Sequence, residues 1–345
     1  RDNFLKKASG YEFYNTSKYT FESLLDDANN IETNFRNYIN GFSSNVRQII
    51  EKFKFDNEIR TMADKNLLYI VIQEFTTPKA NLHPNKISNL EMGYIFEEII
   101  RRFSEAHNED AGQHYTPREV IELMVNILFA NDTDILAGNV AKTLYDPACG
   151  TGGMLSVAQD YLEKLNKSAT LLPFGQEIND ETFAICKADM LIKDNNADNI
   201  RNGNTLSQDE FKGEKFDYIL SNPPYFIDSL LPPDGKRERA RHTGTLDYEV
   251  LFEGASYLLL PDGKLSLVSP ADLQEHLIFI ASLYGFYPVR FTYVSGISGK
   301  TPKRLLSEWS RARRALEENA FSIEKRGEGY TLEYIMLTRD FYLKM

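Results

Sequence analysis

Residues 143–155 read TLYDPACGTGGML, and this stretch decides the fold class. A short apolar strand pattern leads to Asp146, and a glycine-rich turn then enters an apolar helix pattern. Gly150, Gly152 and Gly153 allow backbone angles and a close ligand approach that side chains would block. No Lys-Ser or Lys-Thr pair follows the glycines, which excludes a Walker-type phosphate loop, and the spacing does not fit GxGxxG. The turn predicts a ligand site; an ordinary strand-to-helix turn is the alternative.

A second motif, SNPPY at residues 221–225, directly follows the strand pattern FDYIL. Its two prolines end the strand and stiffen the loop, which fixes where the Asn222 side chain and the Pro223 carbonyl point. Two such acceptors can each bind one hydrogen of an exocyclic amine and localise its lone pair. Tyr225 offers a flat face for a base taken out of its stack. A plain Pro-Pro turn is the alternative for this motif taken alone.

From Lys142 onward, short apolar strand patterns alternate with helix patterns. This alternation predicts a mainly parallel sheet with helices on both faces, an α/β fold whose ligands bind at the carboxyl ends of the strands. The expected strands are 143–145, 171–174, 199–201, 218–220, 264–268, 289–294 and 332–337. The expected helices include 154–165, 180–192, 248–259 and 273–283.

Residues 1–110 have a different pattern, with apolar residues at nearly every third or fourth position and no strand-like alternation. This spacing predicts helices. A break at 76–89 precedes another helix, and Pro117 is well placed to open the next one, through Ile127. We therefore expect two domains, a helical N-terminal domain at 1–110 and an α/β domain at 111–345.

Composition excludes several classes of protein. The chain has 345 residues, a net charge of −11 and 42% hydrophobic residues, enough for a substantial core. Two cysteines are too few for a disulfide framework or a four-thiolate zinc site, and the histidines lack metal-ligand spacing, so we expect no metal. We find no membrane-length apolar run and no signal peptide, and expect a cytoplasmic protein. Because the sequence begins with Arg1, we expect a truncated or processed N-terminus.

Two motifs carry a family resemblance. DPACGTGG resembles the first motif of S-adenosylmethionine (SAM)-dependent methyltransferases that act on exocyclic amines of nucleic-acid bases. NPPY resembles the catalytic motif of adenine-N6, cytosine-N4 and glutamine-N5 methyltransferases. The resemblance implies a Rossmann-like, seven-stranded fold with its last strand antiparallel and SAM as cofactor. It also implies a set of catalytic residues: Asn222, Pro223, Pro224 and Tyr225.

Residues from about 1 to 220 resemble the modification (M) subunits of type I restriction–modification systems, which are adenine-N6 DNA methyltransferases. The resemblance rests on the helical N-terminal region, GQHYTPREVIELMV, DPACGTGGML and GQE, in that order. Glu177 is where an acidic residue can hold ribose hydroxyls, and Asn204 stands where most relatives have Asp. The implied cofactor-binding residues are Tyr115, Thr116, Pro117, Asp146, Ala148, Gly150, Thr151, Gly152, Gly153, Glu177, Ile178, Asn204 and Thr205.

Residues from about 216 to 345 are similar instead to bacterial adenine-N6 methyltransferases that act on the anticodon loop of a valine tRNA. The segments that carry this resemblance include RERARHTGTLDYEVLFEGASYLL and YGFYPVRFTYVSGISGKTPKRLLSEWSR. The two resemblances meet at FDYILSNPPY, so the chain looks like a chimaera joined at a shared motif. The implied substrate-side residues are Arg239, Arg241, His242, Lys303 and Arg304.

Together these features predict an enzyme that transfers a methyl group from SAM to adenine N6 in DNA, with a tRNA anticodon loop as the alternative substrate. A non-catalytic scaffold would need neither intact NPPY nor the glycine-rich motif. The basic stretches after Tyr225 and the family resemblances on both sides make a glutamine-N5 protein methyltransferase the less favoured reading. The expected partner is nucleic acid, with no membrane. The M-subunit resemblance implies specificity and restriction subunits, whereas the lack of that family's C-terminal tail weighs against this assembly.

Overall fold

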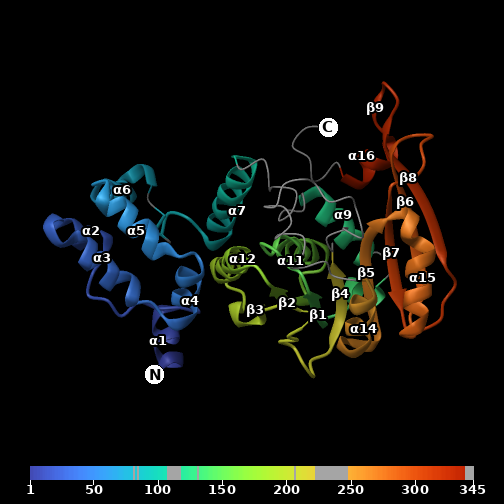
Figure 1. The fold of residues 1–345 in the computed structure, drawn as a ribbon, viewed down its shortest axis with the longest axis horizontal. Helices are drawn as coiled ribbons and strands as arrows, with labels where there is room; N and C mark the ends of the chain where they lie inside the picture. Colours follow the sequence, from blue (N-terminus) through green and yellow to red (C-terminus); the bar gives the residue numbers. More distant parts are fainter. Residues whose placement is uncertain are drawn as a thin grey trace, which may run out of the picture. The chain divides into compact units, whose positions relative to one another are not determined.

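The computed structural model describes residues 1–80, 82–83, 85–106, 118–129, 132–205, 207–221 and 248–338. The chain divides into two compact units, which we name the helical unit (Arg1–His114 and Asn179–Ile200) and the sheet unit (Tyr115–Ile178 and Arg201–Met345) (Figure 1). Among the described residues, every helix is too short or too polar to cross a bilayer. The same ranges contain no group of three or more His, Cys, Asp or Glu side chains suited to a metal ion.

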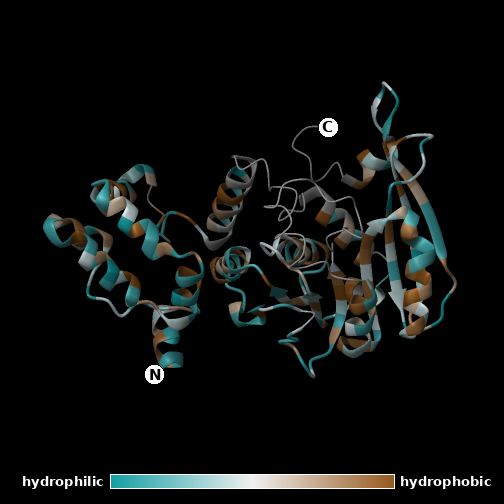
Figure 2. Ribbon diagram, viewed as in Figure 1, coloured by the Kyte–Doolittle hydropathy of each residue, from teal (hydrophilic) through white to brown (hydrophobic). Residues whose placement is uncertain are grey.

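The helical unit has short amphipathic helices around a small apolar core. Figure 2 shows polar and apolar residues alternating around them. The core is formed by Leu24, Phe35, Ile59, Leu68 and Ile72, all buried. The helices are α1 (Asp2–Ser9), α2 (Phe21–Leu25), α3 (Ile31–Asn40), α4 (Ser44–Lys52), α5 (Phe55–Asp64), α6 (Leu68–Thr76), α7 (Asn89–Ala106) and α12 (Asp180–Ile192). Single 3-10 turns lie at Ala28–Asn30, Pro78–Ala80 and Ala197–Asn199.

Helix α12 comes from the middle of the chain and packs against α4 and α7. Its first turn is capped by Asn179, whose side-chain oxygen accepts hydrogen bonds from the backbone N–H groups of residues 181 and 182. Lys52 of α4 pairs with Asp180 at 2.6 Å, and Lys187 donates to the Gln48 side chain at 2.9 Å. Burial lowers the pKa of Lys187. The helix expected at 180–192 is therefore confirmed.

Within the described ranges, the sheet has nine strands in the order β3-β2-β1-β4-β5-β7-β6-β8-β9. The pairs β1–β2, β1–β4, β4–β5 and β6–β8 are parallel, whereas β7 is antiparallel to both β5 and β6. The expected mainly parallel α/β class is confirmed. The strands are β1 (Ala141–Asp146), β2 (Thr170–Glu177), β3 (Ile200–Asn202), β4 (Phe216–Ser221), β5 (Leu259–Pro270), β6 (Tyr287–Ile297), β7 (Arg304–Ser310), β8 (Glu317–Lys325) and β9 (Gly329–Tyr330).

Helices pack on both faces of this sheet. On one face, the Tyr218 ring of β4 meets Phe129 of α9 with centroids 5.6 Å apart, and α11 packs against α9, β1 and β2. Ile219, the next residue of β4, belongs to the cluster under α14 and α15, because successive strand residues point to opposite faces. The helices are α9 (Arg118–Phe129), α10 (Thr133–Ala137), α11 (Gly153–Leu165), α14 (Tyr248–Leu258), α15 (Gln274–Leu283) and α16 (Leu332–Thr338), with a 3-10 turn at Ala271–Leu273.

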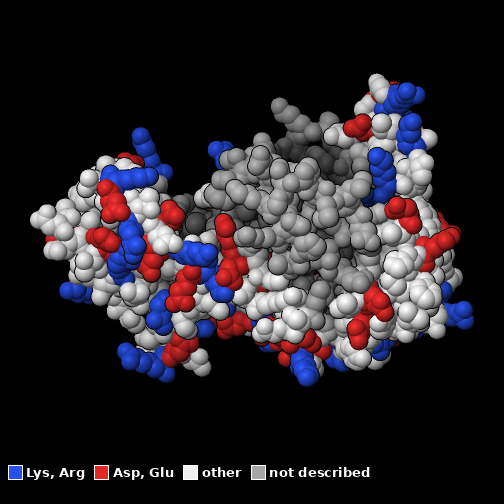
Figure 3. Space-filling view, viewed as in Figure 1, with Lys and Arg blue, Asp and Glu red and all other residues white. Residues whose placement is uncertain are grey.

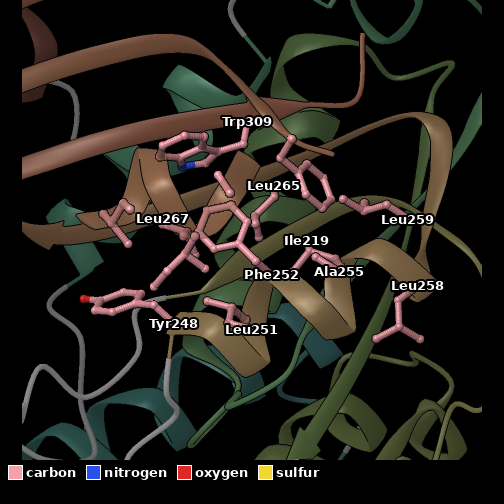
Figure 4. Packing of buried hydrophobic residues seen from close by; sticks show 14 of the residues in the cluster. Ile219, Tyr248, Leu251, Phe252, Ala255, Leu258, Leu259, Leu265, Leu267 and Trp309 are labelled. Carbon is pink, nitrogen blue, oxygen red and sulfur yellow. The ribbon is translucent and has the colours of Figure 1, made fainter. Parts of the chain in front are cut away.

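The main core of the sheet unit is aromatic. Figure 4 shows Trp309 of β7 among side chains of α14 and β5. The Trp309 ring lies edge-on to Phe252 at 5.2 Å and to Phe291 at 5.5 Å between centroids, a geometry that adds to the area buried. Its indole N–H donates to the Ser307 hydroxyl at 2.9 Å. The one tryptophan of the chain therefore reports on the folding of this unit.

Two expectations about the strands are wrong. Residues 332–337 form helix α16 rather than a strand; the Thr331 hydroxyl accepts a hydrogen bond from the Tyr334 N–H and so caps its first turn. The described residues form a sheet of nine strands instead of the expected seven; its last strand, β9, is antiparallel to β8, as expected, and β7 is a further antiparallel strand.

Candidate cofactor and catalytic site

Three strand ends meet at one edge of the sheet. Asp146 ends β1, Glu177 ends β2 and Ser221 ends β4. The register pairs Tyr145 with both Phe174 and Ile219, so these parallel strands end within two or three residues of the same level. This is the carboxyl edge, where ligands of such sheets bind.

The glycine-rich turn at this edge needs its glycines. Gly150 has φ 53° and Gly152 φ 83°, both in the left-handed region that side chains disfavour. The Gly152 N–H donates to the Cys149 carbonyl at 2.8 Å, and the Gly152 carbonyl accepts from Ser156 N–H in the first turn of α11. The turn thus brings backbone from Asp146 directly into the N-terminus of a 13-residue helix.

Glu177 holds the turn in place. One of its carboxylate oxygens accepts a hydrogen bond from the Gly150 N–H at 2.9 Å. Its backbone carbonyl accepts from the Gly203 N–H and from the Asn202 side chain, both at 3.0 Å. Glu177 is 9% exposed. This one residue therefore links the turn after β1 to the segment after β3.

Asp146 makes no ion pair with a Lys, Arg or His side chain among the described residues. Its side chain is 2% exposed, and one of its oxygens accepts from the Ala148 N–H at 3.1 Å. Burial raises the pKa of Asp146 to about 7; the Ala148 hydrogen bond opposes this rise and the Glu177 charge adds to it. A buried carboxyl that titrates near neutrality is typical of a functional site.

Cys149 is a packing residue of the turn. Its N–H donates to the Gln176 carbonyl at 3.1 Å, and its side chain is buried. A Cβ added to Gly175 of β2 would lie 2.8 Å from the Cys149 sulfur, closer than such atoms approach. Gly175 is therefore required for the turn to pack against β2.

The remaining described cofactor candidates surround the turn. Ile178 follows Glu177 and is 47% exposed, an apolar side chain open to a ligand. Thr205 donates its hydroxyl hydrogen to the Pro147 carbonyl at 2.6 Å, so it supports the turn. Asn204 is half-buried beside it, as are Ala148, Thr151 and Gly153 in the turn itself.

Several predicted site residues lie outside the described residues. These are Tyr115, Thr116 and Pro117, the catalytic residues Asn222, Pro223, Pro224 and Tyr225, and the substrate-side residues Arg239, Arg241 and His242. Lys303 and Arg304 are described. Arg304 is the strand partner of Pro270 at the end of β5, so Arg304 and the neighbouring Lys303 lie at the carboxyl edge.

Gln176 is a residue that the sequence analysis did not single out. It is fully buried, its side-chain nitrogen donates to the Gln208 carbonyl at 2.7 Å, and its side-chain oxygen accepts from the Glu210 N–H at 3.3 Å. It thereby orders residues 208–210 beside the site. Its position directly before Glu177 in GQE was the available signal.

This set of groups fits SAM. The cofactor carries a sulfonium, an ammonium and two ribose hydroxyls, and the site offers the Asp146 and Glu177 carboxyl groups. The left-handed glycines leave backbone accessible, and the exposed Ile178 suits the flat adenine. Burial raises the pKa of Asp146 and so disfavours its charged form; a cationic group bound beside it would favour the carboxylate.

Two family models match the chain. Residues 88–256 match the family described as N-6 DNA Methylase, and residues 1–75 match the HsdM N-terminal domain. The tRNA1(Val) (adenine(37)-N6)-methyltransferase of Bacteroides fragilis is 44% identical over 131 residues, 38% of this chain and 55% of that protein. The protein of the same name from Tolumonas auensis is 40% identical over 135 residues, 39% of this chain and 57% of that protein. The chain spans about half the length of these curated relatives.

Solved structures share the fold. The type I restriction–modification methyltransferase subunit of Streptococcus thermophilus has a TM-score of 0.64 and 18% identity, covering 98% of this chain and 76% of its own. A putative class I SAM-dependent methyltransferase of Listeria monocytogenes has a TM-score of 0.54 and 13% identity, covering 93% and 96%. The fold and the two resemblances expected from the sequence are confirmed: residues 1–75 are similar to the HsdM N-terminal domain, residues 88–256 are similar to the N-6 DNA Methylase family, and the fold is that of SAM-dependent methyltransferases.

Proposed function

We propose that this protein transfers a methyl group from SAM to the N6 amine of adenine in nucleic acid, with DNA as the first substrate. The observation that carries the proposal is the pairing of β4 with β1. Ile219 lies beside Tyr145, so Ser221 ends one residue beyond the level of Asp146. Ser221, which directly precedes Asn222 in the sequence, therefore lies at the edge that holds the glycine-rich turn.

The chemistry follows from the roles of four residues. Asn222 and Pro223 each accept one hydrogen of the adenine amine through an oxygen atom, which directs the nitrogen lone pair outward. Pro224 stiffens the loop, and Tyr225 stacks on the base taken out of its helix. SAM supplies the electrophilic methyl group when bound. The N–C bond forms as the S–C bond breaks, and the nitrogen then loses one proton.

The cofactor is held by the residues at the strand ends. We assign the ribose hydroxyls to Glu177, the ammonium end to Asp146 and the adenine to Ile178 with Asn204. The turn residues Ala148, Gly150, Thr151, Gly152 and Gly153 approach through their backbone, and Thr205 supports them. Tyr115, Thr116 and Pro117 complete this assignment.

A tRNA is the second candidate substrate, and one observation favours it. The curated relatives that match at 40–44% identity are named as tRNA1(Val) (adenine(37)-N6)-methyltransferases. The match of residues 1–75 to the HsdM N-terminal domain supports DNA instead, and supports assembly with further subunits of a restriction–modification system.

The test is methyl transfer from labelled SAM to three substrates, namely duplex DNA, total tRNA and a protein extract. We expect label in DNA, or in tRNA if the second candidate holds, and its loss in the Asn222→Ala variant. Label in protein alone would contradict the proposal, as would equal transfer by the variant. A parallel size-exclusion run with a type I specificity subunit tests assembly.

A further inference from the structure

Two loops bring cationic side chains to the carboxyl edge, beyond the cofactor site. The β6–β7 loop carries Lys300 and Lys303, β7 begins with Arg304, and the β8–β9 hairpin carries Lys325 and Arg326. All five are exposed, and we name this set the basic ridge. Figure 3 shows Lys and Arg atoms gathered over this end of β8 and β9.

Backbone hydrogen bonds fix the ridge to the sheet. The Ser298 N–H of the β6–β7 loop donates to the Glu324 carbonyl at 2.7 Å, which joins the loop to the end of β8. The Lys303 N–H donates to the Val294 carbonyl at 2.9 Å, and the Lys303 carbonyl accepts from the N–H of residue 271 at 3.3 Å. The cations therefore stand on ordered backbone.

Strand register gives the distance of the ridge from Ser221, the last residue of β4. Ser221 pairs with Leu267, which pairs with Ser307, so Arg304 lies two strands away and three residues further along. On a flat sheet this separation is about 14 Å. The same register puts Ser221 level with Glu318, so Lys325 lies four strands away and seven residues beyond, about 30 Å.

The residues of the ridge are exposed to solvent. Among the described residues, no ion pair is recorded for Lys300, Lys303, Lys325 or Arg326. Further from the carboxyl edge, by contrast, Lys264 of β5 pairs with Glu308 of β7 at 3.6 Å and Arg290 of β6 pairs with Glu317 of β8 at 3.5 Å. The hairpin also holds Glu324 and Glu328, which leaves the ridge with a clear cationic excess.

We infer that the basic ridge binds the phosphate backbone of the DNA duplex that flanks the target adenine. A span of about 30 Å corresponds to about nine base pairs at 3.4 Å each, so the outer cations meet phosphates almost one helical turn from the base. The protein is acidic overall, but nucleic-acid phosphates bind where exposed cations are concentrated, and the ridge is such a local excess. The inference rests on the proposed function.

The matched control lies at the other end of β7. Arg313 and Arg314 are exposed and follow Ser310, the end of β7 opposite to Arg304. The double variant Arg313→Glu with Arg314→Glu therefore changes net charge as much as Lys325→Glu with Arg326→Glu does. Trp309 fluorescence verifies that both variants fold, and the corresponding Ala pairs repeat the test without added negative charge.

The experiment measures the affinity of the full chain for a 24-base-pair duplex with a central adenine, over a series of salt concentrations. In the ridge variant we expect binding to weaken about 10-fold or more and the salt slope to fall by about 2, because two phosphate contacts are lost. We expect the control pair to keep the wild-type slope.

Three results would overturn the inference: an unchanged slope in the ridge variant, an equal change in the control, or no salt-dependent binding of duplex by the wild type. An effect confined to a stem-loop RNA would overturn the duplex assignment. Methyl transfer measured in the same samples separates this test from the proposed function. If the wild type transfers methyl groups and the ridge variant keeps the wild-type salt slope, only the ridge inference is refuted. If binding depends on the ridge but no methyl group is transferred, only the proposed function is refuted.

Discussion

Replacing Asp146 with Asn should stabilise the cofactor-free protein, by an amount that grows as the pH rises from 3.8 to 7. Burial raises the pKa of Asp146 from 3.8 to about 7, so the folded state prefers the neutral acid and the unfolded state the carboxylate. The contribution of the Asp146 carboxyl group to folding stability is fully present below pH 3.8 and is lost as the pH rises through 7. The amide of Asn keeps an oxygen that can accept the Ala148 hydrogen bond.

The magnitude follows from the pKa difference. At 1.36 kcal/mol per unit, the raised pKa of Asp146 lowers the free energy of unfolding by about 4 kcal/mol at pH 8 and about 2 kcal/mol at pH 5.5, relative to a carboxyl whose pKa stays at 3.8. The free energy of unfolding of Asp146→Asn should therefore exceed that of wild type by these amounts. This gain would come with a loss of SAM binding, an expected conflict between stability and function.

Urea unfolding followed by Trp309 fluorescence measures the difference, because this residue is fully buried in the sheet unit. The control is Asp262→Asn, which makes the same change of charge at an exposed position and should shift stability by less than about 0.5 kcal/mol. A pH-independent difference between Asp146→Asn and wild type would refute the reasoning, and so would a variant less stable than wild type at pH 8.

Three further predictions concern the site. SAM affinity should rise about 10-fold from pH 6 to pH 8 as Asp146 ionises; calorimetry should find a flat profile in Asp146→Asn, and a flat wild-type profile would exclude this role. Asn222→Ala should lower kcat about 100-fold while the Kd for SAM changes less than about 3-fold; near-normal turnover would show the catalytic assignment to be wrong. Gly175→Ala should cost about 1–3 kcal/mol and weaken SAM binding, because its Cβ would displace Cys149 and the turn; unchanged unfolding and calorimetric curves would contradict that.

The sequence predicts well those elements whose signals are local. Helix α12 has its cap, Asn179, and a continuous apolar pattern within thirteen residues, and it begins and ends where expected. Strand β1 and the turn after it are specified by Asp146 and the glycines. These features depend on residues close together in the chain.

Elements that depend on distant partners are harder to predict. Residues 332–337 are too short an apolar run for periodicity to separate helix from strand. In β7, Glu308 is buried because Lys264 of β5 pairs with it, and such a pairing cannot be seen in the sequence. Strand β8 is mostly polar and exposed and lacks the alternation of a half-buried strand.

The same limit applies to the site. The motifs indicate that Asp146 and Glu177 serve one ligand. The raised pKa of Asp146, however, arises from burial by several strands of the sheet. The hydrogen bond from the Gly150 N–H to the Glu177 carboxylate likewise needs the register of β1 with β2. The basic ridge likewise depends on the pairing of β6 with β8.

Nucleoside mass spectrometry after incubation with isotopically labelled SAM tests the central claim most directly. Duplex DNA and total tRNA are incubated separately with the wild-type chain and with Asn222→Ala, digested, and searched for each methylated nucleoside. We predict labelled N6-methyladenine with the wild type and its loss with the variant. Label in N4-methylcytosine, or no labelled nucleoside from either nucleic acid, would contradict the account.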